Sequence, residues 1–229
     1  MTHLVDLAEQ FTRDLNAALH AANGTSTPEQ WRVINPRGLH NLAVGVDAPL
    51  HIAIEGHVGY YCAGMNKYAH ITVYGNAGPG VAENMMSGLV RITGSASQYA
   101  GASAHGGLIV IEGDASSRCG ISMKGVDIVV RGNTGHMSAF MAQSGRLVVC
   151  GDAGDALGDS LYEARLYVRG TVASLGADCI EKSMKDKHKR ELEQLLEEAG
   201  ISGADAGEFR RFGSARELYH FKVDNADAY

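Results

Sequence analysis

Apolar and polar residues alternate in seven short segments of the chain, and each segment ends at a glycine. These glycines recur every 19 residues: Gly56, Gly75, Gly94, Gly113, Gly132, Gly151 and Gly170. Apolar residues stand four and two positions before every glycine, as Ile52 and Ile54 stand before Gly56. Positions between and beside these columns hold residues such as Glu55, Arg91 and Tyr167. This period-2 pattern predicts strands with one buried face.

The residues after each glycine also form columns. A small residue stands two positions on, and a mostly apolar one ten positions on, such as Met85, Met123 and Leu161. A unit of 19 residues is too short for a strand–helix–strand motif, which needs about 30 residues. It suits one coil of a solenoid whose coils stack about 4.8 Å apart. We therefore expect an all-β fold: a right-handed parallel β-helix of about seven coils, with glycines that allow positive φ at the corners.

One stretch, GNAGPG at 75–80, has the look of a phosphate-binding loop, because it follows a strand-like run and is rich in glycine. Its first glycine, however, is the corner glycine that all seven repeats share. The pattern therefore indicates architecture rather than a nucleotide site.

The two ends of the chain lack the repeat. Residues 1–30 are expected to form an amphipathic helix over 4–22 and a connection, and residues 31–180 the β-helix. Residues 181–229 are expected to form a helix from Ser183 to about Ala199, followed by an aromatic tail. A solenoid must cover its open ends, so the tail either caps the β-helix or docks on a partner subunit.

Composition narrows the setting. The 229 residues carry a net charge of −6 and include no apolar run long enough to cross a membrane, so neither nucleic acid nor a membrane is an expected partner. No signal peptide is recognisable and no C-x-x-C motif occurs, which favours a cytoplasmic protein without disulfides.

The sequence predicts no catalytic, cofactor-binding or metal-binding residues in this chain. Cys62 and Cys119 share a column but lie three coils apart, too far to hold one metal. His51 and His70 fall in adjacent coils and supply only two ligands. No Cys, His and acid converge in phase, and no nucleophile motif occurs.

Five stretches are richer than the architecture needs: 59–66, 81–88, 116–125, 135–145 and 154–164. They occupy equivalent parts of successive coils, so we expect one stacked surface, with Met85 and Met123 pointing inward. Together with the tail they give the candidate subunit-interface residues: Tyr60, Tyr61, Met65, Glu83, Asn84, Met86, Arg118, Lys124, His136, Met137, Asp159, Ser160, Glu163, Phe209, Phe212, Tyr219 and Phe221.

These stretches carry a resemblance. The strings GYYCAGMN, GPGVAENMMSG, SSRCGISMKG, GHMSAFM, CGDAGDALGDSLYEA and SLGADCIEK, with the closing FRRFGSARELYHFKVDNADAY, resemble the stand-alone β-helix subunit of N-methylglutamate synthase, also called methylamine–glutamate N-methyltransferase. The glycine repeat itself resembles the C-terminal β-helix of the glutamate synthase large subunit. The resemblance covers nearly the whole chain.

What the resemblance implies is a multisubunit enzyme that makes N-methylglutamate and ammonia from methylamine and glutamate. One partner subunit would be similar to a class II glutamine amidotransferase. The other would be similar to the FMN-binding part of glutamate synthase. FMN, and any iron–sulfur clusters, would then be held by the partners, and this chain would be a β-helix scaffold without catalytic residues.

Two alternatives stay open. The same repeat resembles the scaffold subunit of formylmethanofuran dehydrogenase or of the related formyltransferase/hydrolase complex. A stand-alone solenoid enzyme is the other. A lyase would need exposed aspartates in adjacent coils, and an acyltransferase a six-residue period. The repeats offer neither.

Overall fold

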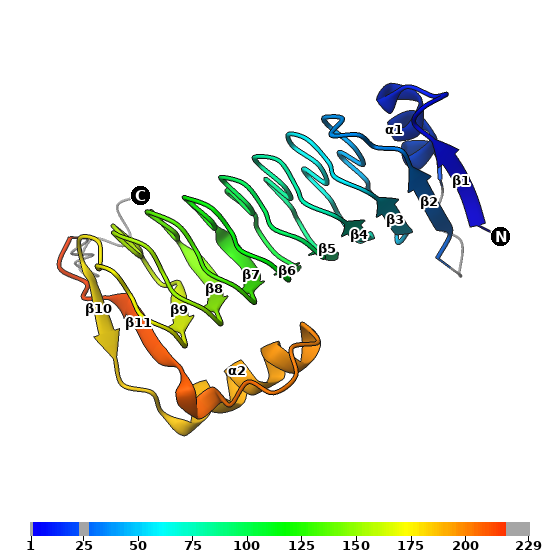
Figure 1. Cartoon of the computed structure of the whole chain (residues 1–229). Helices are drawn as coiled ribbons and strands as arrows, with labels where there is room; N and C mark the ends of the chain where they lie inside the picture. Colours follow the sequence, from blue (N-terminus) through cyan, green and yellow to red (C-terminus); the bar gives the residue numbers. More distant parts are fainter. Residues whose placement is uncertain (1, 23–27, 219–229) are drawn as a thin grey trace, which may run out of the picture.

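The fold is built on one long sheet of stacked coils (Figure 1). The computed structural model describes residues 2–22 and 28–218. Each of seven coils contributes one strand: β3 (His51–Glu55), β4 (His70–Tyr74), β5 (Leu89–Ile92), β6 (Leu108–Ile111), β7 (Lys124–Val130), β8 (Ser144–Val149) and β9 (Arg165–Val168). Neighbouring strands pair in parallel, and His51 lies opposite His70 as Arg146 lies opposite Arg165. Residues that are equivalent in the 19-residue repeat therefore lie opposite one another in the sheet, and the predicted parallel β-helix is confirmed.

The apolar columns form the core. Ile71, Val90, Ile109 and their equivalents are fully buried, and a second ladder of single bridges joins the small residues two positions after each glycine, from Val58 to Val172. Met85 and Met123 are also fully buried, so the prediction that they point inward is confirmed.

The corner glycines serve a different purpose from the one the sequence predicts. Only Gly56 of the seven has a positive φ; the other six do not. At each of these six, an added Cβ would lie within 3.0 Å of the backbone of the preceding corner glycine; at Gly132 it would be 2.7 Å from the Gly113 carbonyl oxygen. The column is glycine because stacked backbones approach too closely for a side chain.

A side-chain ladder runs beside the glycines. The residue after each of the first six corners accepts a hydrogen bond from the backbone N–H of the equivalent residue in the next coil, as Asp114 Oδ1 accepts from Asn133 at 2.7 Å. The same bond recurs along the column: His57, Asn76, Ser95, Asp114, Asn133 and Asp152 all accept. These bonds satisfy corner N–H groups that have no strand partner.

The N-terminal segment differs from the predicted helix over 4–22. It starts with strand β1 (Thr2–Asp6), which pairs in parallel with β2 (Gln30–Ile34), and β2 pairs with β3. Helix α1 covers only Thr12–Ala21 and buries Leu15 and Leu19. Leu4 and Phe11 are 58% and 77% exposed, so the first part of the predicted helix over 4–22 does not bury its expected apolar face. Strand pairing with β2 prevails over helical periodicity because it extends the sheet's hydrogen-bond ladder by one strand.

The C-terminal helix covers a sheet face, not an end. Helix α2 (Asp186–Glu198) lies along the outer face of the strands in Figure 1 and packs on Val110, Val129, Val148 and Tyr167. The sequence predicts one buried face for these strands, which is wrong for β6–β9, since these four outward-facing residues are buried as well. Neither α1 nor α2 is long and apolar enough to span a membrane, as far as the structure describes the chain.

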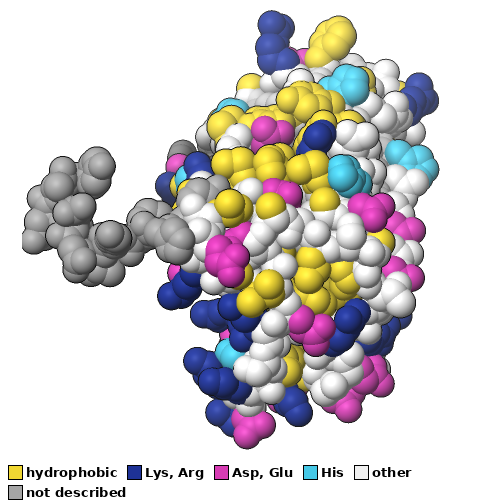
Figure 2. All heavy atoms as spheres, turned by 90° about the vertical axis from the view of Figure 1, so that its left-hand side faces the viewer, with side chains coloured by type: hydrophobic (Ala, Val, Ile, Leu, Met, Phe, Trp, Pro, Cys, Tyr) yellow, Lys and Arg dark blue, Asp and Glu magenta, His cyan; other side chains and the backbone are white. Residues whose placement is uncertain are grey.

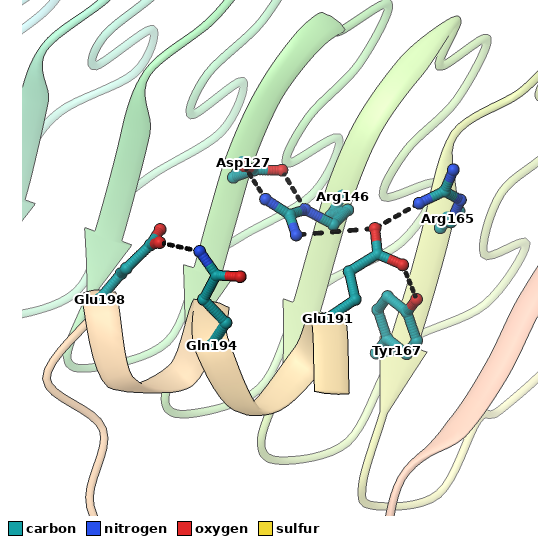
Figure 3. A network of polar contacts seen from close by, with 7 residues as sticks. All are labelled: Asp127, Arg146, Arg165, Tyr167, Glu191, Gln194 and Glu198. Atoms are coloured by element: carbon teal, nitrogen blue, oxygen red, sulfur yellow. Dashed lines mark hydrogen bonds and ion pairs between the residues drawn. The ribbon is translucent and has the colours of Figure 1, made fainter. Parts of the chain in front are cut away.

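A polar network fastens this helix to the sheet (Figure 3). Glu191 of α2 forms ion pairs with Arg146 and Arg165 and accepts a hydrogen bond from the Tyr167 hydroxyl. Arg146 also pairs with Asp127 on the neighbouring strand. At the other end of α2, Arg91 Nη2 donates to the Ala199 carbonyl at 2.7 Å, where the helix dipole favours a cation.

Two antiparallel strands close the C-terminal edge. Strand β11 (Arg210–Ser214), which follows the short 3₁₀ helix η1 (Ala206–Glu208), pairs with β9, and β10 (Cys179–Lys182) pairs with β11. Phe209 is 3% exposed beneath α2, and Phe212 is 2% exposed in the solenoid core. Both were expected as interface candidates. That expectation is corrected, because they cover the chain's own core.

Candidate interaction surface

The side of the coils opposite the strands has an unusual backbone. Residues five, seven and nine positions after a corner glycine take a positive φ in successive coils, as Met137, Ala139 and Met141 do at 56°, 58° and 52°. Their N–H groups point alternately to the next and the preceding coil: Met137 donates to Asp155 O, and Ala139 to Cys119 O, each at 2.8 Å. This side is therefore hydrogen-bonded from coil to coil, like the sheet, and is not a row of loose loops.

The alternation sorts side chains into inward and outward sets. Positions six, seven and ten after the glycine point inward and are buried, as Cys119, Gly120 and Met123 show. Positions four, five, eight, nine and eleven stay partly or fully exposed in most coils. We call this outward set, within residues 60–67, 79–86, 98–105, 117–124, 136–143 and 155–162, the loop face.

The loop face carries exposed apolar side chains. Met65 and Met86 are each 46% exposed, Tyr60 47% and Met141 40%. Figure 2 shows hydrophobic side chains gathered between acidic, basic and histidine side chains on the side of the molecule toward which the coil loops project. Methionine is flexible and polarisable, so such a surface suits contact with a partner protein.

The other predicted residues of the five stretches lie on the same side. Tyr61, Glu83, Asn84, Arg118, Met137, Asp159 and Ser160 are half-buried, while Lys124, His136 and Glu163 are exposed. Met141 was absent from the predicted set although it shares the column of Met65. Tyr219 and Phe221, also predicted as interface residues, lie outside the described residues.

One cluster joins two neighbouring coils. The rings of Tyr60 and Tyr61 lie 5.5 Å apart, and Asn84 Nδ2 donates to the Tyr61 hydroxyl at 3.3 Å. A Cβ built on Gly80 would lie 2.8 Å from Glu83 Oε2 and 3.4 Å from the Tyr60 ring. The cluster therefore surrounds Gly80, and burial raises the pKa of the Glu83 carboxyl above its usual value.

Other predicted residues make bonds within the chain. Arg118 donates to the Tyr99 hydroxyl at 3.3 Å, and Asp159 accepts from Ser160 Oγ and from the Ala177 N–H. Glu163 pairs with both oxygens to Arg216, at 2.9 and 3.0 Å. Asp159 and Glu163 thus hold the last coil to the closing segments and lie several coils from the tyrosines.

The cysteines are part of the core. Cys62 and Cys119 are fully buried, and burial raises the pKa of both thiols to about 12. They stay protonated at neutral pH and are poor nucleophiles and poor ligands. Within the described residues no group of three His, Cys, Asp or Glu side chains could hold a metal ion.

Comparison with known proteins gives one close relative. Protein GlxC of Rhizobium meliloti (strain 1021) is 62% identical over 226 residues, which cover 99% of this chain and 99% of the relative. The name of that protein states no activity. No family model matches the chain, and no solved structure matches it.

Proposed function

This chain belongs to the family of Protein GlxC, and from that premise we propose that it is a non-catalytic scaffold subunit of a flavin-dependent N-methylglutamate synthase complex. The complex converts methylamine and glutamate into N-methylglutamate and ammonia. In this proposal the chain works in the cytoplasm and holds two catalytic partners: an amidotransferase-like subunit and an FMN-binding, glutamate synthase-like subunit.

The observation that supports the proposal is the loop face. Its exposed methionines and tyrosines come from the stretches whose strings resemble the β-helix subunit of N-methylglutamate synthase. The core is filled without them, because positions six, seven and ten of each coil supply the inward side chains. Exposed Met and Tyr are therefore not needed for folding, and contact with a partner gives them a role.

The rigidity of the loop face also suits a scaffold. Hydrogen bonds between coils fix each outward side chain at a spacing of about 4.8 Å from its equivalent in the next coil. A partner that docks there needs little reordering of this chain, which lowers the cost of binding.

Co-purification tests the proposal. The tagged full-length chain, expressed in the native host together with its proposed partner subunits, should co-purify with an amidotransferase-like protein and a yellow, FMN-containing protein. The mixture should form N-methylglutamate from glutamate and methylamine, whereas the purified chain alone should not. Turnover by the chain alone, or recovery of a formylmethanofuran-type complex instead, would reject the proposal.

A matched pair of variants locates the contact. Tyr60→Glu with Met86→Glu places two charges on the loop face and should abolish co-purification. Tyr74→Glu is the control, because Tyr74 is 55% exposed on β4, on the strand side of the coil. Both proteins should keep the far-ultraviolet circular dichroism of the parent. Equal recovery of partners by both would move the contact away from the loop face.

A further inference from the structure

A cation-rich cavity lies where the last coil meets the closing strands. It has a volume of about 260 Å³ and is lined from β9, β10 and β11 and the segments beside them. Its charged lining residues are Glu163, Arg165, Lys182, Arg211 and Arg216. Four cations thus share the cavity with one carboxylate, in a chain whose net charge is −6. The local excess of positive charge is opposite in sign to the charge of the whole molecule.

Two of these cations already have carboxylate partners. Arg216 pairs with Glu163, and Arg165 pairs with Glu191 of α2. Neither Lys182 nor Arg211 has a carboxylate within 4.0 Å among the residues that the structure describes. Among the described residues, Arg211 donates one hydrogen bond, from its Nε to the Ser183 carbonyl at 3.2 Å. Its two terminal nitrogens and the Lys182 ammonium therefore remain as donors for a bound group.

The main chain of β11 lies beside these donors. Gly213 lines the cavity, and the Lys182 stem lies beside it: a Cβ built on Gly213 would lie 3.7 Å from Lys182 Cγ. The positive region continues into an adjoining cavity of about 190 Å³, which is lined by Arg165, Lys187, His188 and Glu191. Like charges are thus held close together on three strands and a helix, which costs energy unless an anion offsets it.

We propose that this cavity binds a small oxyanion, the carboxylate or phosphate group of a low-molecular-weight ligand, between Lys182 and Arg211. The planar guanidinium of Arg211 suits two parallel hydrogen bonds to such a group, and Lys182 adds a point charge. The bound anion would link the last coil, through Arg165, to β10 and β11. Binding would therefore strengthen the closure of the C-terminal end, and it does not depend on the scaffold role.

Thermal unfolding of the full-length chain tests this inference. Inorganic phosphate and succinate are compared with chloride at equal ionic strength, so that general screening is held constant. Phosphate, succinate or both should raise the melting temperature in a concentration-dependent way, and the difference between the two distinguishes the phosphate source from the carboxylate source. No rise over chloride with either anion would overturn the proposal.

Variants place the site. Lys182→Gln and Arg211→Gln should each weaken binding by at least tenfold in calorimetric titration while the unliganded fold is kept. Lys124→Gln is the matched control, since Lys124 is an exposed lysine at the start of β7, away from the cavity. Amide chemical shifts of Gly213 and Ser214 should move on titration of the parent. Binding of parental strength in both cavity variants, or shifts confined to other residues, would refute the assignment.

Discussion

Substitution of a corner glycine tests whether the stacked coils approach too closely for a side chain. In Gly132→Ala the new Cβ would lie 2.7 Å from the Gly113 oxygen and 2.3 Å from Asp114 Oδ1. A carbon normally approaches such an oxygen to about 3.3–3.6 Å, so the two coils must separate locally by roughly 0.6 Å. The Gly132 N–H donates to that same Gly113 oxygen at 3.0 Å, and the separation would break this bond.

The expected cost follows from these two effects. Overpacking in a close-packed region costs about 1–3 kcal/mol, and a lost backbone hydrogen bond about 1 kcal/mol. We expect Gly132→Ala to lower the free energy of unfolding by about 2–4 kcal/mol. For a chain of this length that corresponds to a fall of about 4–16 °C in melting temperature. Urea titration and thermal melts followed by circular dichroism measure both quantities.

Two further glycines serve as controls. Gly38 has a φ of +74° and nothing within 4 Å of a built Cβ, so Gly38→Ala isolates the cost of a left-handed backbone, about 1–2 kcal/mol. Gly213 has neither a positive φ nor a close approach, so Gly213→Ala should change stability by no more than about 0.5 kcal/mol. If Gly132→Ala were as harmless as Gly213→Ala, the close-approach explanation would be refuted.

The other predictions concern different parts of the fold. Ser103 has a φ of +53°, so Ser103→Gly should raise the free energy of unfolding by about 0.5–1 kcal/mol in urea titration. Leu195, on the buried face of α2, is 1% exposed, so Leu195→Ala should lower the free energy of unfolding by about 2–5 kcal/mol and speed tryptic cleavage in the helix. Burial raises the pKa of the Cys62 and Cys119 thiols from 9.0 to about 12, so their stabilising effect is complete below pH 9 and is lost toward pH 12. The free energy of unfolding should therefore be lower at about pH 10.5 than at about pH 8, and a thiol reagent at the lower pH should label the cysteines only after unfolding.

The sheet was predictable because the alternation of apolar and polar residues that determines it is local and recurs in every coil. Apolar residues at the same two positions in seven coils are all buried in only one parallel register of the strands. The structure has that register from His51 to Arg165. The column of corner glycines was equally recognisable in the sequence, but the reason why these positions must be glycine was not. Positive φ is a property of one residue, whereas the approach of Gly132 to Gly113 is a distance between two coils.

The helix on the outer face was missed for a related reason. Val110, Val129 and Val148 are apolar at the position between the two core columns, and Tyr167 continues that column. This signal was present in the sequence, but Arg91 in the same column suggested a solvated face. The structure explains both observations, because α2 covers β6–β9 and Arg91 binds the carbonyl at its C-terminal end.

The tail could not be assigned from its composition. Phe209 and Phe212 are aromatic whether they cap a core or dock on a partner, and only the pairing of β11 with β9 decides for capping. Removal of residues 209–229 would therefore take away a strand of the sheet and part of both cores. A truncation meant to test docking has to begin after the described residues, beyond Leu218.

The backbone of the loop face also bears on what the sequence resemblance means. In a string such as GYYCAGMN, positions six, seven and ten after the corner glycine supply Cys62, Ala63 and Asn66, which are buried and serve the coil. Tyr60 and Met65 belong to the outward positions, where a polar residue such as Ser103 or Ser122 is accommodated in other coils. The fold therefore accounts for only half of the string. In the outward half, Tyr60 and Met65 stay 47% and 46% exposed, although the Tyr60 ring contacts those of His40 and Tyr61. Exposed apolar area of this kind has a cost in water. Under the scaffold proposal, a partner subunit would cover that half, and it would be the part of the resemblance that concerns function rather than architecture.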